Sequence, residues 1–177
     1  MAYERHSGVL FVDEFNREQC DSFFDKHSMF KVASPGDANA RIRERIVATL
    51  GMRPGVLKQV SRTAGRHQPV DAANPLAVDA VERHIEQQRH FAWADAVNLL
   101  AKHPELAPMG KALLIEPVLG WADAGVGVLF VDRLAPALGQ FKTFVIDGKR
   151  DFRFYSPLHR EAVERWLAAR AEDRTVD

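Results

Sequence analysis

The sequence predicts a single α+β domain, with helices over the first two thirds of the chain and mainly strands over the last third. Apolar residues recur at helical spacing up to about residue 104, whereas short runs rich in strand-forming residues follow Lys111. A Ser-Pro pair then precedes a last amphipathic segment. We therefore expect residues 1–177 to form one domain, in which a helical part packs on a mainly antiparallel sheet and a C-terminal helix closes the fold.

Helix caps and helical periodicity predict five helices. They cover residues 17–27, 38–50, 54–65, 75–102 and 157–170. Asn16 can cap the first helix with its side chain, and Gly51 ends the second because glycine readily adopts the backbone of a helix end. Pro54 begins the third, since the N–H that proline lacks has no partner in a first turn. The fourth is either one long helix or two helices with a bend near Gln88.

Five short apolar runs are predicted as strands. They cover residues 9–12, 112–115, 127–131, 141–146 and 149–155. Between the last two stands Asp147-Gly148, a pair that suits the positive φ angles of a tight hairpin turn. We expect the last four strands to form one antiparallel sheet, with the long helix around Trp93 packed on it.

The composition favours a cytoplasmic protein. Cys20 is the only cysteine, which excludes an internal disulfide and a cysteine-based zinc site. No apolar run approaches the ~20 residues that a membrane helix needs, and the N-terminus does not read as a secretory signal. The net charge is zero, so the charge of the whole protein points to neither DNA nor membrane. We expect no membrane association, no metal and no cofactor.

Basic residues are nevertheless concentrated in one segment. Residues 41–67 hold seven Arg or Lys against one acid, Glu44, whereas residues 68–125 hold four basic residues against eight acids. Such a separation of charge within a chain indicates a partner of opposite charge. The partner of the basic segment is either outside the protein or the acidic segment that follows it.

Residues 46–62 resemble the helix-turn-helix of DNA-binding regulators. Apolar residues fall where that motif needs them, Gly51 stands at the turn, and Pro54 opens the second helix. The resemblance implies a helical subdomain over residues 38–66 that presents polar side chains to DNA. These side chains belong to Arg45, Arg53, Lys58, Gln59, Arg62 and Arg66. Arginine and lysine suit guanine or phosphate, and glutamine suits adenine. The same shape also occurs in ordinary helix packing.

A second pattern resembles metal-dependent nucleases of the restriction-enzyme type. Asp132 and Asp147 would hold Mg²⁺, Lys149 would orient the attacking water, and Glu116 or Glu86 could supply a third carboxylate. The alternative is turn chemistry, because Asp147 also starts the predicted hairpin turn, and a turn tip points away from a central sheet. We therefore expect no nuclease activity.

Three classes of function follow from these patterns. A non-catalytic DNA-associated regulatory protein is the first interpretation. The second is a protein-binding module of the inhibitor, immunity or adaptor type, in keeping with the segregated charge and the lack of a catalytic motif. A metal-dependent nuclease is the third. Histidines add no site, because only His90 shares a helix face with an acid, Glu86, and His159 stands isolated at the start of the last helix.

Overall fold

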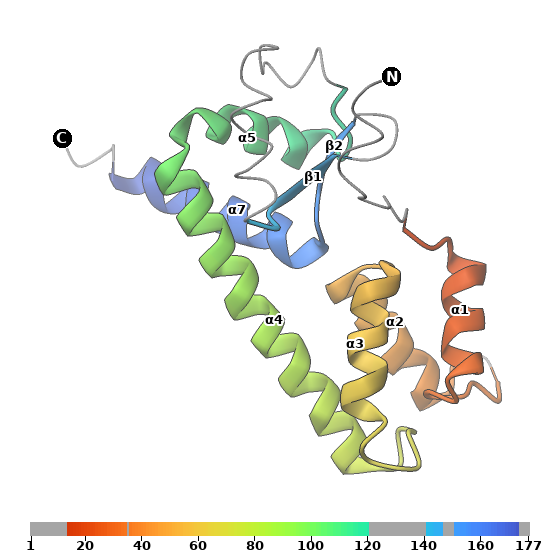
Figure 1. Cartoon of the computed structure of the whole chain (residues 1–177). Coiled ribbons are helices and arrows are strands. Elements are labelled where there is room, and N and C mark those ends of the chain that lie inside the picture. The colour runs from red at the N-terminus through yellow and green to blue at the C-terminus, as the bar shows by residue number, and fades with distance from the viewer. Residues whose placement is uncertain (1–13, 35, 121–140, 147–150, 174–177) are drawn as a thin grey trace, which may run out of the picture.

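Helices make up most of the structure, a computed structural model that describes residues 14–34, 36–120, 141–146 and 151–173. Within these ranges lie six α-helices, one 3-10 turn and two short strands (Figure 1). The elements are α1 (Arg17–Lys26), α2 (Ala38–Leu50), α3 (Pro54–Ala64), α4 (Pro75–Lys102), η1 (Pro104–Leu106), α5 (Ala107–Ile115), β1 (Phe144–Ile146), β2 (Phe152–Phe154) and α7 (Pro157–Asp173). The predicted α+β class is confirmed.

The longest helix, α4, is the element on which most of the others pack. It runs without a break through all of its 28 residues, so the predicted alternative of two helices with a bend near Gln88 is wrong. Asn74 caps it by accepting a hydrogen bond from the Leu76 N–H, and Pro75 occupies its first turn. In Figure 1 α2 and α3 lie beside its first half and α7 lies beside its second half, whereas α5 follows beyond its end and packs on α7.

Helix α7 crosses the second half of α4. Arg165 of α7 lies over the ring of Trp93 at 4.8 Å from its centroid, and Glu161 stands 3.8 Å from Arg89 of α4. On the same stretch of α4, Ala92 and Ala96 are fully buried. Small side chains at these positions let the two helices approach closely, and the C-terminal helix expected from the sequence is present.

The predicted hairpin is confirmed, although its strands are shorter than expected. Strands β1 and β2 pair antiparallel, with Phe144 opposite Phe154 and Val145 opposite Arg153. Leu119 adds a bridge to β2, because its N–H and C=O both bond to Phe152. The predicted Asp-Gly turn of the hairpin and the predicted strands at 9–12 and 127–131 lie outside the described residues.

One predicted strand, residues 112–115, is wrong. These residues belong to helix α5, whose C-cap Glu116 donates its N–H to the Ala112 carbonyl. A short apolar run does not by itself distinguish a strand from a buried helix. Here alanine and leucine are strong helix formers, and Pro108 stands in the first turn, where helices accept it.

The turn between α2 and α3 depends on a glycine. Gly51 has φ 84° and ψ −174°, a conformation that is essentially restricted to glycine. A Cβ atom built on Gly51 would also lie 3.3 Å from the Cδ of Pro157, at the start of α7. The carbonyl of the next residue, Met52, accepts a hydrogen bond from the Phe15 N–H at 3.0 Å. This bond attaches the residues just before α1 to the turn.

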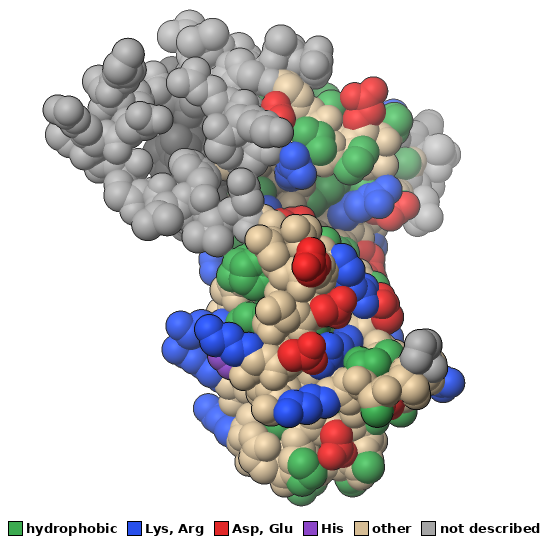
Figure 2. Space-filling view, turned by 90° about the vertical axis from the view of Figure 1, so that its right-hand side faces the viewer, with side chains coloured by type: hydrophobic (Ala, Val, Ile, Leu, Met, Phe, Trp, Pro, Cys, Tyr) green, Lys and Arg blue, Asp and Glu red, His purple; other side chains and the backbone are tan. Residues whose placement is uncertain are grey.

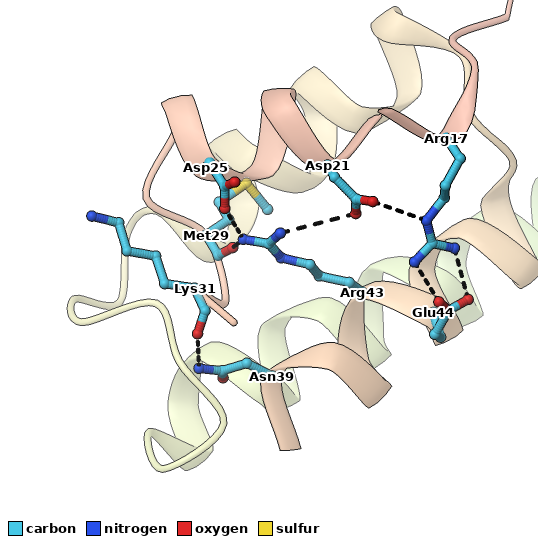
Figure 3. A network of polar contacts seen from close by, with 8 residues as sticks. All are labelled: Arg17, Asp21, Asp25, Met29, Lys31, Asn39, Arg43 and Glu44. Carbon is cyan, nitrogen blue, oxygen red and sulfur yellow. Dashed lines mark hydrogen bonds and ion pairs between the residues drawn. The ribbon is translucent and has the colours of Figure 1, made fainter. Parts of the chain in front are cut away.

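A polar network joins α1 to α2 (Figure 3). Arg43 is 3% exposed and donates from Nη2 to Asp25 Oδ1 at 2.6 Å and to the Met29 carbonyl at 3.1 Å. Its guanidinium also lies over the Phe24 ring, 5.1 Å from the centroid. Arg43 therefore holds α1 in place and is not available to an external partner.

We expect Gly51→Ala to lower the free energy of unfolding by about 1–3 kcal/mol, because alanine is strained in this backbone conformation. Gly55→Ala is the matched control, since Gly55 lies in the exposed first turn of α3 with open space around it. That change should stabilise the protein by up to about 1 kcal/mol through helix propensity. Urea unfolding followed by circular dichroism measures both, and equal stability of the two variants would contradict the prediction.

Arg43→Met should lower the free energy of unfolding by about 1–3 kcal/mol, because the carbonyl of the buried Met29 loses its donor. The same change at Arg41, an exposed residue of the same helix, should stay within about 0.5 kcal/mol of the wild type. Both variants are compared by urea unfolding. An unchanged free energy of unfolding in Arg43→Met would show that the network in Figure 3 does not hold α1.

Candidate functional site

Helix α3 presents a polar face to solvent on the side opposite its core contacts. Its apolar side is buried and packs on α4. The other side carries Lys58, Gln59, Arg62 and, just past the helix end, Arg66, all of them exposed. We call these four residues the basic face of α3. Within the described parts of the chain, no ion pair engages its three cations.

Figure 2 shows how charge is distributed over one side of the molecule. Lys and Arg side chains gather along the left-hand edge of the helical part, with a histidine among them. Over the middle of the same view, acidic and basic side chains alternate. The surface therefore contains a region where positive charge is not offset by neighbouring acids, which favours contact with an anionic partner.

Two of the predicted DNA-facing residues are used inside the fold. Arg53 donates from Nε to the Tyr155 carbonyl at 2.8 Å and lies over the Tyr155 ring, and its side chain is only 17% exposed. Arg45 forms a bidentate pair with Glu82 of α4, at 2.6 and 2.9 Å. The expectation that Arg53 faces outward on the second helix is therefore wrong. Arg45 remains on the surface, but its guanidinium is already paired with Glu82 of the acidic segment.

An open groove of about 570 Å³ runs between α1 and α3 beside the basic face. Phe15, Phe23 and His27 line it on the α1 side, with ring centroids 6.1 Å apart for the two phenylalanines and 4.3 Å apart for Phe23 and His27. Lys26 and Lys58 also line the groove. Sequence reasoning missed it, because the groove combines faces of two helices whose packing is not visible in the chain order.

A buried polar cluster lies where α7 begins. Ser156 Oγ and His159 Nδ1 are 2.8 Å apart, and His159 Nε2 is 3.8 Å from Asp95 Oδ2 of α4. The prediction that His159 is isolated is therefore wrong. Its signal in the sequence was the Ser-x-x-His spacing at a helix start, which brings the two side chains together.

The cluster resembles a nucleophile, base and acid, but its surroundings do not suit catalysis. Ser156 is 7% exposed and His159 is 6% exposed. The cavity beside them has a volume of about 10 Å³, which is no more than one water molecule needs. Burial, aided by the charges of Lys142 and Arg53, lowers the pKa of His159 to about 4. His159 is therefore uncharged at pH 7, and its contact with Ser156 is a packing contact.

The described residues provide no metal centre for the nuclease alternative. Asp132, Asp147 and Lys149 lie outside the described ranges. Glu116 is exposed at the end of α5, and Glu86 pairs with Arg89 at 2.7 Å. Among the residues that can be described, no three His, Cys, Asp or Glu side chains come together as metal ligands do.

Comparisons with known proteins add no assignment to this geometry. No protein-family model matches the chain, and neither the curated proteins nor the solved structures contain a match. None of the helices in the described ranges has the length and apolar character needed to cross a bilayer.

His159 should make the protein less stable in acid. Its pKa is about 4 in the folded protein and 6.5 ordinarily, so the unfolded chain takes up a proton first as the pH falls. The contribution is on the order of 3 kcal/mol, fully present above pH 6.5 and lost between pH 6.5 and pH 4. The groups facing the ring are Asp95 on α4, Lys142 before β1 and Arg53 before α3.

His159→Gln should flatten the fall in unfolding free energy over that pH range, measured by urea unfolding at several pH values. His84 is also buried, and burial lowers its pKa, so part of the pH dependence should remain. His90→Gln, on the exposed side of α4, is the control and should leave the slope unchanged. An equal slope for wild type and His159→Gln would contradict the assignment.

Proposed function

We propose that this protein is a non-catalytic, cytoplasmic DNA-associated protein that binds nucleic acid through the basic face of α3. The observation that carries the proposal is a contrast within one basic segment. Arg43, Arg45 and Arg53 each have a partner inside the fold, whereas the cations of the basic face have no ion pair with a described residue. A surface built only for solubility would mix both signs of charge.

The spacing of the basic face suits a phosphate backbone. Lys58 and Arg62 lie one helical turn apart, about 6 Å along the helix axis, and Arg66 follows beyond the end of α3. Cations placed in this way can meet different phosphates, and each phosphate contact releases counterions. Because Arg53 is turned toward Tyr155, only Gln59 and the remaining cations can read bases. Phosphate contacts carry no sequence information, so the proposal includes only a weak sequence preference.

An acidic protein partner is the second candidate function. The pair between Arg45 and Glu82 favours it, because a basic residue of this segment already binds a carboxylate in bidentate geometry. In that interpretation the basic face meets acidic side chains of another protein. The two candidates differ in whether the protein binds DNA, as a duplex or as a single strand, at low salt.

The test removes two cations from the basic face. Arg62→Ala with Arg66→Ala should weaken binding to a short labelled duplex, and should reduce the slope of log affinity against log salt by about 2. Fluorescence anisotropy at about 50 and 200 mM salt measures both, over the range where phosphate contacts show. Arg83→Ala with Lys111→Ala removes the same charge from exposed positions on α4 and α5 and is the matched control.

Two outcomes would reject DNA binding by α3. One is that the wild type binds neither a duplex nor a single-stranded oligonucleotide at about 50 mM salt. The other is that both double variants weaken binding equally, since the effect would then come from net charge alone. Either result would favour the acidic protein partner.

A further inference from the structure

The groove between α1 and α3 combines aromatic rings with positive charge. Phe15, Phe23 and His27 form a row in which neighbouring ring centroids lie 6.1 and 4.3 Å apart. Lys26 of α1 and Lys58 of α3 also line the groove. Lys58 belongs to the basic face as well, so the groove and the basic face form one continuous surface.

The aromatic row is more open than a core would allow. Phe24, the neighbour of Phe23, is fully buried, whereas Phe15 and Phe23 are half-buried and His27 is exposed. The groove volume of about 570 Å³ lies within the range of small-ligand sites, roughly 300–1,000 Å³. Phe15 and Phe23 pack partly against the core, and the part of their rings that stays exposed lines the groove, where a flat ligand can enter between the two helices.

We infer that this groove takes unstacked bases of a single-stranded nucleic acid whose phosphates lie on the basic face of α3. The inference rests on the proposed function and names the form of nucleic acid that the same surface prefers. Single strands are bound where aromatic side chains stack with bases and cations follow the backbone. Every base has a ring face, so such a site accepts many sequences. This agrees with the position of Arg53, which bonds to the Tyr155 carbonyl and so does not read bases.

Charge complementarity distinguishes this occupant from an apolar one. The charged side chains that line the groove, Lys26 and Lys58, are both cationic, and no acid lines it among the described residues. A strand that brings a phosphate with each base would neutralise these cations. Bases inside a duplex are stacked on one another and cannot reach the rings, so a duplex would gain only the phosphate contacts.

The experiment compares three probes of equal length on the full chain: oligothymidylate, the same backbone without bases, and a duplex. At low salt the oligothymidylate should bind about tenfold more tightly than the abasic strand, because stacking on an aromatic ring contributes that much per base. Phe23→Leu keeps an apolar side chain in the half-buried position but removes the ring. This variant should lose the preference for oligothymidylate and keep the affinity for the abasic strand.

A second variant tests the groove without touching its aromatic row. Ser22→Glu places an acid in the groove from an exposed position of α1, and it should weaken binding of both single strands. Gln87→Glu adds the same charge at an exposed position of α4 and is the matched control. If Phe23→Leu does not fold, the oligothymidylate and abasic strands on the wild type, together with these two variants, still decide the question.

The outcomes separate this inference from the proposed function. One outcome is equal affinity for oligothymidylate and the abasic strand, with binding still lost in Arg62→Ala/Arg66→Ala. It would contradict the inference that the groove binds bases, and would leave the proposed binding by the basic face intact. Tighter binding of the duplex than of oligothymidylate would do the same. Failure of all three probes to bind at low salt would overturn both, and binding of an oligoglutamate peptide in their place would assign the surface to an acidic protein.

Discussion

The packing of other helices against α4 is the constraint on which the rest of the structure depends. This helix buries side chains along its whole length, from Ala77 to Leu100, so elements at both of its ends are held against one continuous surface. Because α3 packs on α4 and buries Val56, Leu57 and Val60, its remaining side must face solvent. The orientation of the basic face is therefore a consequence of apolar burial on the other side of the same helix.

The basic segment shows that the charge of a segment and the charge of a surface are different quantities. Arg43 is buried, and Asp25 and a carbonyl oxygen accept hydrogen bonds from its guanidinium. Arg53 contacts Tyr155, a residue that is far away in the sequence. A count of charges along the sequence treats these two arginines in the same way as Arg62. Only the fold separates the cations that stabilise it from those that remain for a partner.

Local signals in the sequence were sufficient for five of the six described α-helices but not for the contacts between them. Asn16 and Gly51 mark helix ends by chemistry that acts within a few residues, and the structure confirms both. Residues 112–115 were misassigned because their apolar run fits a helix as well as a strand. The exposed positions of Lys58 and Arg62 follow from helical periodicity, whereas the inward turn of Arg53 depends on a partner beyond the reach of any local rule.

The two parts of the candidate surface are held by different interactions, and this bears on how they could respond to a partner. The basic face is carried by α3, which is fixed by its apolar contacts with α4. The aromatic row is carried mainly by α1, which the polar network around Arg43 and the hydrogen bond from Phe15 to Met52 attach to α2 and its turn. Helix α1 also buries Cys20 and Phe24 completely, so the aromatic row depends on apolar and polar contacts together. The two sides of the groove are thus attached to different helices, α1 to α2 and α3 to α4, and the relative position of these helix pairs sets the width of the groove.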